Sequence, residues 1–171
     1  MTTTRMATRP TPRLVLGDLS GITAASLVLS GLVGVAWGFC APRATVRTLG
    51  EGSFIPPADY GAHDFPLYIA YLLIVIIGGA VIGWVVSRVS STLVGQLVAV
   101  VVGVVSAVTA LAAGHVVAYQ LSDRAALLGP EGVEVAVRSA VDVGTAFLWA
   151  PLAAATAWLW GISRAPSEPE E

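Results

Sequence analysis

The sequence contains no lysine and a single cysteine, and charged residues make up only 12% of its 171 positions. Soluble domains carry about 25% charged residues, so this composition argues against an ordinary water-soluble protein. The net charge of -2 gives no attraction for phosphate backbones, and no basic stripe is interleaved with aromatic residues. We therefore expect no nucleic-acid partner. Because Cys40 is the only cysteine, an internal disulfide is excluded.

Apolar residues are abundant instead: 56% of the chain is hydrophobic and its mean hydropathy is +0.80. Four runs without a central charge each reach the roughly twenty residues that cross a bilayer. They cover about residues 19–40, 66–87, 92–120 and 138–162. The valine-rich third run lacks the alternation of a barrel strand. We predict an all-α polytopic membrane protein whose partner is the lipid bilayer, with four transmembrane helices in a bundle and short outer loops.

The two ends of the chain are polar. Residues 1–13 contain three arginines and are predicted to form a disordered cytoplasmic tail. Four spans return the chain to the same side, so the acidic residues 164–171 form a second cytoplasmic tail and residues 14–163 the transmembrane domain. The bulky residues Trp37 and Phe39 before Cys40 fit neither a signal-peptidase site nor a lipid anchor. The sequence thus predicts a multi-pass protein of a bacterial plasma membrane with both termini cytoplasmic.

Two stretches between the spans are predicted to lie outside the membrane. The first, residues 41–65, is rich in glycine and proline and is expected to be a loop, with "ATVRTL" as a short extended piece. In the second stretch, Glu134, Arg138 and Asp142 are spaced four residues apart, as on one face of a helix. We interpret these three residues as a charge ladder at the start of the fourth span.

Small residues recur at four-residue spacing within the spans, and this spacing lets helix backbones approach closely in lipid. The glycines predicted to pack between helices are Gly34, Gly38, Gly79, Gly83, Gly95, Gly103 and Gly114.

Aromatic residues gather near the ends of the spans, as in interfacial belts. The inner belt is predicted to contain Trp84, Trp158 and Trp160, and the outer belt Trp37, Tyr68 and Tyr119. Trp149 lies in mid-span and is expected to pack between helices.

Residues that could perform chemistry are sparse. His115, near the outer end of the third span, is interpreted as an interfacial histidine. The alternative is an outward-facing metal or proton site that joins it to His63, Asp59 and Asp142, although their spacing matches no zinc motif. No nucleophile with an adjacent base and no phosphate-binding loop is visible. We predict a protein that is not an enzyme, with no catalytic, cofactor-binding or metal-ligating residue.

Transport through a single chain would need polar residues along a path within the spans. The polar residues there are Ser26, Ser30, Gln96, Ser106, Thr109, Thr145 and Thr156. We expect the hydroxyl groups to bond to the backbone of their own helices, and this leaves a single-chain pore unsupported.

Three stretches, "GLVGVAWGFCAPRATV", "ADYGAHDF" and "FLWAPLAAATAWLW", resemble an actinobacterial family of small four-helix integral membrane proteins of unknown function. The matching positions are Trp37, Ala41, Pro42, Arg43, Ala58 and Asp59. The resemblance implies an actinobacterial plasma membrane. It supplies no activity, cofactor or catalytic residue.

The spans contain many small residues suited to helix packing and few residues that could catalyse a reaction. We therefore favour a non-catalytic accessory subunit that packs against a larger respiratory or cell-envelope complex in the plasma membrane. Its outer loops would contact the other membrane subunits through Arg43, Arg47, Asp59, His63 and Asp64. The alternative is a small transporter or lipid-handling protein that acts as an oligomer.

Overall fold

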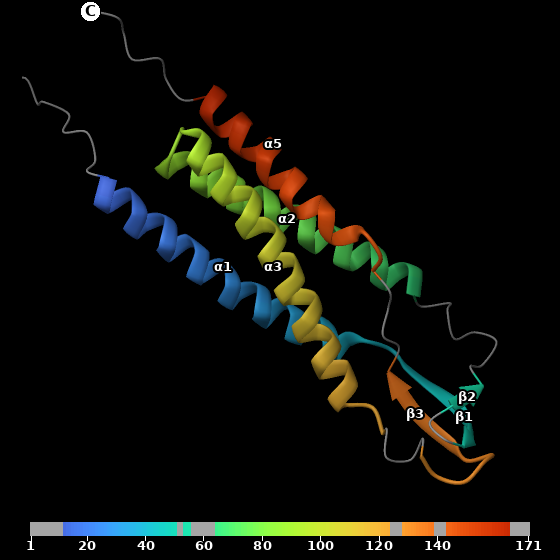
Figure 1. Ribbon diagram of the computed structural model, residues 1–171. Coiled ribbons are helices and arrows are strands. Elements are labelled where there is room, and N and C mark those ends of the chain that lie inside the picture. The colour runs from blue at the N-terminus through green and yellow to red at the C-terminus, as the bar shows by residue number, and fades with distance from the viewer. Residues whose placement is uncertain (1–11, 51–52, 56–63, 124–127, 139–142, 165–171) are drawn as a thin grey trace, which may run out of the picture.

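The computed structural model describes residues 12–50, 53–55, 64–123, 128–138 and 143–164, and these residues form a helical bundle with a small sheet at one end (Figure 1). The helices are α1 (Pro12–Cys40), α2 (Asp64–Val89), α3 (Leu93–Gln120), the short 3-10 helix η1 (Ala146–Leu148) and α5 (Trp149–Ser163). Four segments are long and apolar enough to cross a membrane. The predicted fold, a multi-pass bundle of four transmembrane helices, is confirmed.

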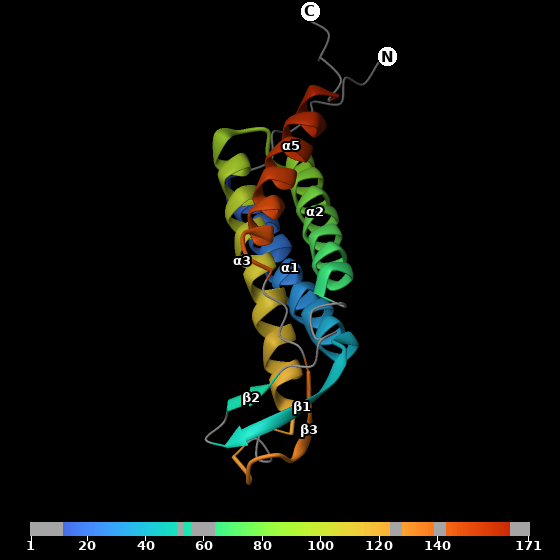
Figure 2. The same ribbon diagram turned by 90° about the vertical axis from the view of Figure 1, so that its right-hand side faces the viewer.

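The start of α1, the connection between α2 and α3, and the end of α5 lie together at one end of the bundle, here called the turn end (Figure 2). The three strands lie at the opposite end, here called the sheet end. α1 packs chiefly along α3, and α2 chiefly along α5, while α3 also contacts both α2 and α5. Because α1 and α3 run in one direction and α2 and α5 in the other, the bundle consists of two parallel helix pairs.

Each helix pair is held at short range by small residues. A Cβ atom at Gly34 of α1 would clash with the backbone of Ala110 in α3, and a Cβ atom at Gly79 of α2 would clash with the backbone of Ala150 in α5. The same clash recurs one turn later between Gly83 and Ala154. Since lipid removes the hydrophobic drive for association, such close backbone contact supplies the packing energy.

The remaining glycines of the predicted set have less uniform neighbours. Gly38 of α1 faces Gly114 of α3, and a Cβ atom at Gly114 would also meet the ring of Trp37. At Gly103 a Cβ atom would lie 3.4 Å from the backbone of Ala150, which is ordinary contact. Gly95 faces Ser90 in the connection between α2 and α3, so it fits a tight turn and not a helix crossing.

The sheet end contains β1 (Arg43–Gly50), β2 (Ser53–Ile55) and β3 (Glu134–Arg138), in the antiparallel order β2-β1-β3. The "ATVRTL" piece was expected to be extended and forms most of β1. Val46 pairs with Val135 on the covered face of the sheet, and a bulge between Thr48 and Gly50 leads toward β2. Gly50 has a φ of 84°, which favours glycine at this position.

The predicted helical charge ladder is wrong for Glu134 and Arg138, because both lie on β3. The segment "EVAVR" alternates, so Val135 and Val137 are buried while Glu134 is exposed, and pairing with β1 provides partners for its backbone. Asp142, the third member of the ladder, lies outside the described residues.

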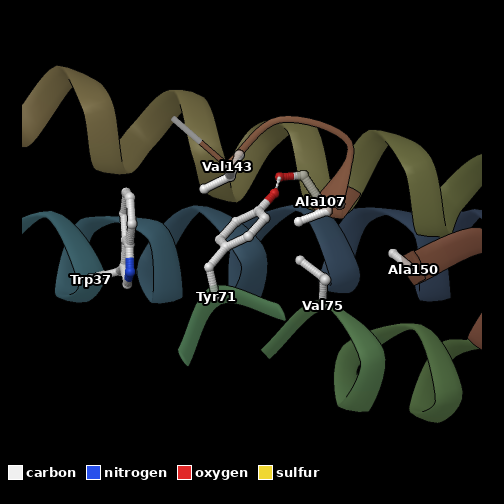
Figure 3. Packing of buried hydrophobic residues seen from close by; sticks show 7 residues of the cluster. Trp37, Tyr71, Val75, Ala107, Val143 and Ala150 are labelled. Carbon is white, nitrogen blue, oxygen red and sulfur yellow. Dashed lines mark hydrogen bonds between the residues drawn. The ribbon is translucent and has the colours of Figure 1, made fainter. Parts of the chain in front are cut away.

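The fourth span is shorter than predicted. Its helical part begins at Ala146 instead of near residue 138, and the 18 residues 146–163 extend about 27 Å. Val143, which precedes it, is 2% exposed and inserts beside Tyr71 and Ala107 (Figure 3). Val143 is therefore buried before the helix begins, whereas Gly144 and Thr145, which follow it, are exposed.

Several aromatic residues lie elsewhere than predicted. Trp37 and Trp158, assigned to the belts, are 7% and 4% exposed and belong to the core. Trp149, expected between helices, is 49% exposed. Trp84 and Trp160 are exposed, as an interfacial belt requires. Position along a span does not by itself tell which side of a helix an indole occupies.

Replacing Gly79 with alanine is expected to destabilise the bundle, because the new Cβ atom would clash with the backbone of Ala150. The matched control is Gly78→Ala on the same helix, where a Cβ atom meets nothing within 4 Å. Gly79→Ala should lower the free energy of unfolding in detergent by about 1–3 kcal/mol. Gly78→Ala should leave it unchanged or raise it by up to about 1 kcal/mol. Unfolding with SDS, followed by circular dichroism, measures both, and equal effects would contradict the packing.

Candidate functional site

Two of the residues predicted to contact a partner lie together on the exposed face of β1. Arg43 and Arg47 alternate with buried residues along the strand and are both exposed, as is Thr45 between them. Glu134 of β3 lies opposite Arg47 on the same face. This face therefore presents two arginines whose Cα atoms are about 13 Å apart along the strand, and Glu134 is the cross-strand neighbour of Arg47.

The other three predicted contact residues do not belong to β1 or β3. Asp59 and His63 lie outside the described residues, and Asp64 is the first residue of α2. A site that joins His63, Asp59, Asp142 and His115 also lies largely outside the described residues. Among the residues that the structure describes, no three His, Cys, Asp or Glu side chains gather as a metal ion would require.

Arg138, which sequence analysis placed on a helix, instead caps the C-terminus of α1. Its Nη1 donates hydrogen bonds to the backbone oxygens of Phe39 at 2.6 Å and Ala41 at 2.9 Å, with the Gly38 oxygen at 3.5 Å. The last carbonyls of a helix have no partner within the helix, and a cation there also interacts favourably with the helix dipole. Arg138 therefore joins the sheet to the transmembrane part of the protein.

Thr48 fixes the second outer stretch on β1. Its side chain is fully buried, and its Oγ1 donates to the backbone oxygens of Pro130 at 2.9 Å or Val133 at 3.1 Å. The same oxygen accepts from the Val133 backbone N–H at 3.1 Å. Gly132, with a φ of 87°, donates from its backbone to the Thr48 oxygen at 2.9 Å. No sequence pattern indicated that Thr48 of the "ATVRTL" piece would bind the segment before β3.

An aromatic cluster lies inside the bundle toward the sheet end. The Trp37 ring is 5.8 Å from the Tyr71 ring and 6.1 Å from the His115 ring, measured between centroids. Tyr71 is 1% exposed, and its hydroxyl donates to the backbone oxygen of Ala107 at 3.0 Å (Figure 3). His115 of α3 is half-buried, with its ring beside that of Trp37.

The turn end is closed by polar contacts that involve α5, the connection between α2 and α3, and the first turn of α3. The buried indole N–H of Trp158 donates to the backbone oxygen of Ser90 at 3.0 Å. Thr92 caps the N-terminus of α3 by accepting from the Gly95 backbone N–H at 3.4 Å. These bonds satisfy backbone groups that a short connection between two transmembrane helices leaves open.

Basic residues lie over exposed indoles at this same end. The Arg88 guanidinium is 4.9 Å from the Trp84 ring centroid, and the Arg164 guanidinium is 4.2 Å from that of Trp160. Trp beside Arg is the composition of a membrane–water boundary.

An apolar groove lies between α1 and α2, which contact one another much less than either contacts its paired helix. Its volume is about 370 Å³, and its walls and floor also include residues of α3 and α5. The lining contains serine, glycine, alanine and branched aliphatic residues and no charged residue. A volume of this size is within the range of ligand pockets, about 300–1,000 Å³.

Hydroxyl groups in the spans behave in two ways. Thr109 donates to the Val105 oxygen and Thr156 to the Leu152 oxygen, both at 2.8 Å, so the expected bonding to their own helices is confirmed for these two. Ser106 differs: it is 5% exposed, and its Oγ has no hydrogen-bond partner among the described residues. Ser106 lines the groove between α1 and α2.

Comparison with protein-family models, curated proteins and solved structures found no match to this chain. Its candidate sites are therefore defined by their geometry: the arginine face of β1 and the groove between α1 and α2.

Replacing Arg138 with methionine is expected to loosen the sheet from the bundle, because the carbonyls at the end of α1 lose a charged donor. Such hydrogen bonds contribute about 1.5–3 kcal/mol. Hydrogen exchange of the β1 amides, measured in detergent micelles, should become faster. Arg43→Met is the matched control on the neighbouring strand, because Arg43 is exposed opposite Arg138, and it should change stability by less than about 0.5 kcal/mol. Unchanged exchange in Arg138→Met would contradict the capping role.

Proposed function

We propose that the protein is a non-catalytic subunit that packs against other subunits of a larger complex in the plasma membrane. The observation that carries this proposal is the incomplete packing of α1. In the most apolar part of α1, 11% of the residues are buried, against 33% in α2 and 39% in α3. A helix with one main neighbour has most of its surface available to another membrane protein.

The free side of α1 is suited to a neighbouring helix and not only to lipid. Gly17, Gly21, Ala24 and Val28 follow the four-three-four spacing of one helical face, and all four are exposed. A Cβ atom at Gly17 or Gly21 would meet nothing within 4 Å. Elsewhere in this bundle, glycines with such spacing lie at helix crossings, and the free side of α1 offers the same surface with no partner among the residues that the structure describes.

The arginine face of β1 lies beyond the opposite end of α1 from Gly17 and Gly21 and is proposed as a second contact with the same partner. β1 begins three residues after α1 ends, so Arg43 and Arg47 follow directly from the free helix. A subunit that binds α1 in the bilayer can therefore also offer carboxylates to these arginines. One partner subunit could bind both surfaces, with one of its helices against α1 in the bilayer and its acidic residues against β1 at the membrane boundary.

The turn end is proposed to face the cytoplasm of the bacterial cell, with both termini on that side. Arg88 and Arg164 lie at this end over Trp84 and Trp160, and basic residues near span ends favour the cytoplasmic side. Pro12 and Ser163, the outermost residues of the helices α1 and α5, are also at this end.

The single cysteine gives a direct test of this orientation. Cys40 is exposed at the sheet end of α1, so a membrane-impermeant maleimide should label the protein in intact spheroplasts. In the double variant Cys40→Ser, Ser163→Cys the thiol lies at the turn end and should be labelled only after permeabilisation. The reverse pattern would contradict the proposed orientation and leave the fold unaffected.

Photo-crosslinking in living cells tests the proposed partner. A photoreactive amino acid at Ala24, on the free side of α1, should give one discrete adduct with another membrane protein. The same group at Val101, which is 57% exposed on α3, should give mainly lipid adducts. Gly21→Leu should abolish the adduct and reduce the size of the complex on native gels, because a larger side chain separates the helices.

The identity of the adduct decides between the functional alternatives. A different membrane protein, crosslinked at Ala24 and lost in Gly21→Leu, supports the subunit role. Adducts with a second copy of this chain alone would contradict that role and favour an oligomer. Equal crosslinking at Ala24 and Val101 would also contradict it, because contact would then be non-specific.

A further inference from the structure

Two arginines lie over exposed tryptophans at the turn end, one pair on α2 and one pair at the end of α5. The Arg88 guanidinium is 4.9 Å from the Trp84 ring centroid, and the Arg164 guanidinium is 4.2 Å from that of Trp160. All four residues are exposed. Each arginine follows its tryptophan by four residues, which is the spacing of neighbours on a helix surface. These four residues are here called the arginine–tryptophan patch.

Both halves of the patch lie on the same side of the α2–α5 pair. A Cβ atom at Gly161 of α5 would clash with the Ser87 side chain of α2, so these two residues face each other where the helices pack. Trp160 precedes Gly161 by one residue, and Arg88 follows Ser87 by one residue. Because the two helices are parallel, one step backward on α5 and one step forward on α2 turn toward the same side. The same Cβ atom at Gly161 would lie 4.0 Å from the Trp84 ring.

The two arginines also lie at nearly the same depth. Arg88 is one residue beyond Ser87 and Arg164 is three residues beyond Gly161, so their Cα atoms differ by about 3 Å along the helix axes. Axes of packed helices are about 8 Å apart. The two spans end at Val89 and Ser163, so both arginines are at the level where lipid head groups begin.

No carboxylate among the described residues balances these two charges. The acidic residues that the structure describes are Asp18, Asp64, Asp123, Glu131 and Glu134. All except Asp18 are at the sheet end, and Asp18 belongs to α1, which packs chiefly along α3. An indole covers only the flat side of a guanidinium, so the N–H donors in its plane remain available to an external anion.

The surroundings of the arginines select a phospholipid as the source of this anion. A guanidinium forms paired hydrogen bonds with a phosphate. On the same side of α2, Ile77 and Leu73 lie seven and eleven residues before Trp84 and are 61% and 53% exposed. They continue the surface from the patch toward the membrane interior, where acyl chains lie. A soluble phosphate would gain nothing from this apolar surface, whereas two arginines at one depth match two phosphates in one head group.

We propose that the arginine–tryptophan patch binds cardiolipin, an anionic phospholipid whose two phosphates are joined by one glycerol. One phosphate binds Arg88 and the other binds Arg164, and the acyl chains lie along the exposed apolar side of α2 and α5. Binding of the first phosphate raises the effective concentration of the second at the neighbouring arginine. Phosphatidylglycerol, with one phosphate, lacks this gain. The patch lies on the helix pair that does not include α1, so crosslinking at Ala24 tests the subunit role independently.

Native mass spectrometry of the purified full-length protein in a neutral detergent tests the proposal, because it counts bound lipids. Cardiolipin, phosphatidylglycerol and phosphatidylcholine are titrated separately. The wild type should bind one cardiolipin at least about fivefold more tightly than phosphatidylglycerol, and phosphatidylcholine most weakly. Arg88→Gln and Arg164→Gln should each weaken cardiolipin binding about fivefold, and the double variant about 25-fold.

Two further double variants provide the controls. Arg43→Gln, Arg47→Gln removes the same charge at the sheet end and should change cardiolipin affinity less than about twofold, because charges that far away are screened. Arg88→Lys, Arg164→Lys keeps both charges without the planar fork, and its affinity should lie between those of the wild type and the Arg88→Gln, Arg164→Gln variant.

Three outcomes would overturn the proposal. The first is equal affinity of the wild type for cardiolipin and phosphatidylglycerol. The second is an equal loss of cardiolipin binding in the two glutamine double variants, because the effect would then be one of net charge alone. The third is a lysine double variant as weak as Arg88→Gln, Arg164→Gln, because the loss would then not depend on the charges that the patch presents.

Discussion

Close backbone contact between small residues is the interaction on which this structure depends. A lipid tail solvates leucine as well as a neighbouring helix does, so burial of apolar side chains gives little drive for association. What remains is van der Waals contact, and the helix backbones approach closely where Gly34 meets Ala110 and where Gly83 meets Ala154. These contacts occur between helices of the same direction. The unit of the fold is therefore a parallel helix pair, and α3 joins the two pairs.

The two ends of the bundle satisfy the same backbone requirement by different means. At the turn end the connection is short, and the Trp158 indole with the Thr92 hydroxyl is enough to close it. At the sheet end, Arg138 of β3 donates hydrogen bonds to the backbone oxygens at the end of α1. The sheet therefore contributes to the helical part directly, because it positions one cation at the end of α1.

The features that the sequence predicts well are those set by lipid alone. Run length and the absence of charge predict four spans, and four-residue spacing indicates glycines such as Gly34 and Gly79 that lie at helix crossings. Features that depend on contacts between distant segments are not predicted. The charge spacing of Glu134 and Arg138 fits a helix, but pairing with β1 makes the segment a strand. Nothing local distinguishes Ser106, whose hydroxyl has no hydrogen-bond partner among the described residues, from Thr109, which bonds to its own helix.

Packing by parallel pairs also accounts for the surfaces that the bundle leaves open. α1 places the glycines of its close helix crossing, Gly34 and Gly38, against α3 toward the sheet end, and no glycine of α1 lines its side toward α2. The space between α1 and α2 therefore persists as a groove, which residues of α3 and α5 also line. On the side of α1 away from the groove, Gly17 and Gly21 remain exposed, because α1 packs chiefly against α3. The groove between α1 and α2 and the free side of α1 thus both result from the packing of α1 chiefly against one helix, α3.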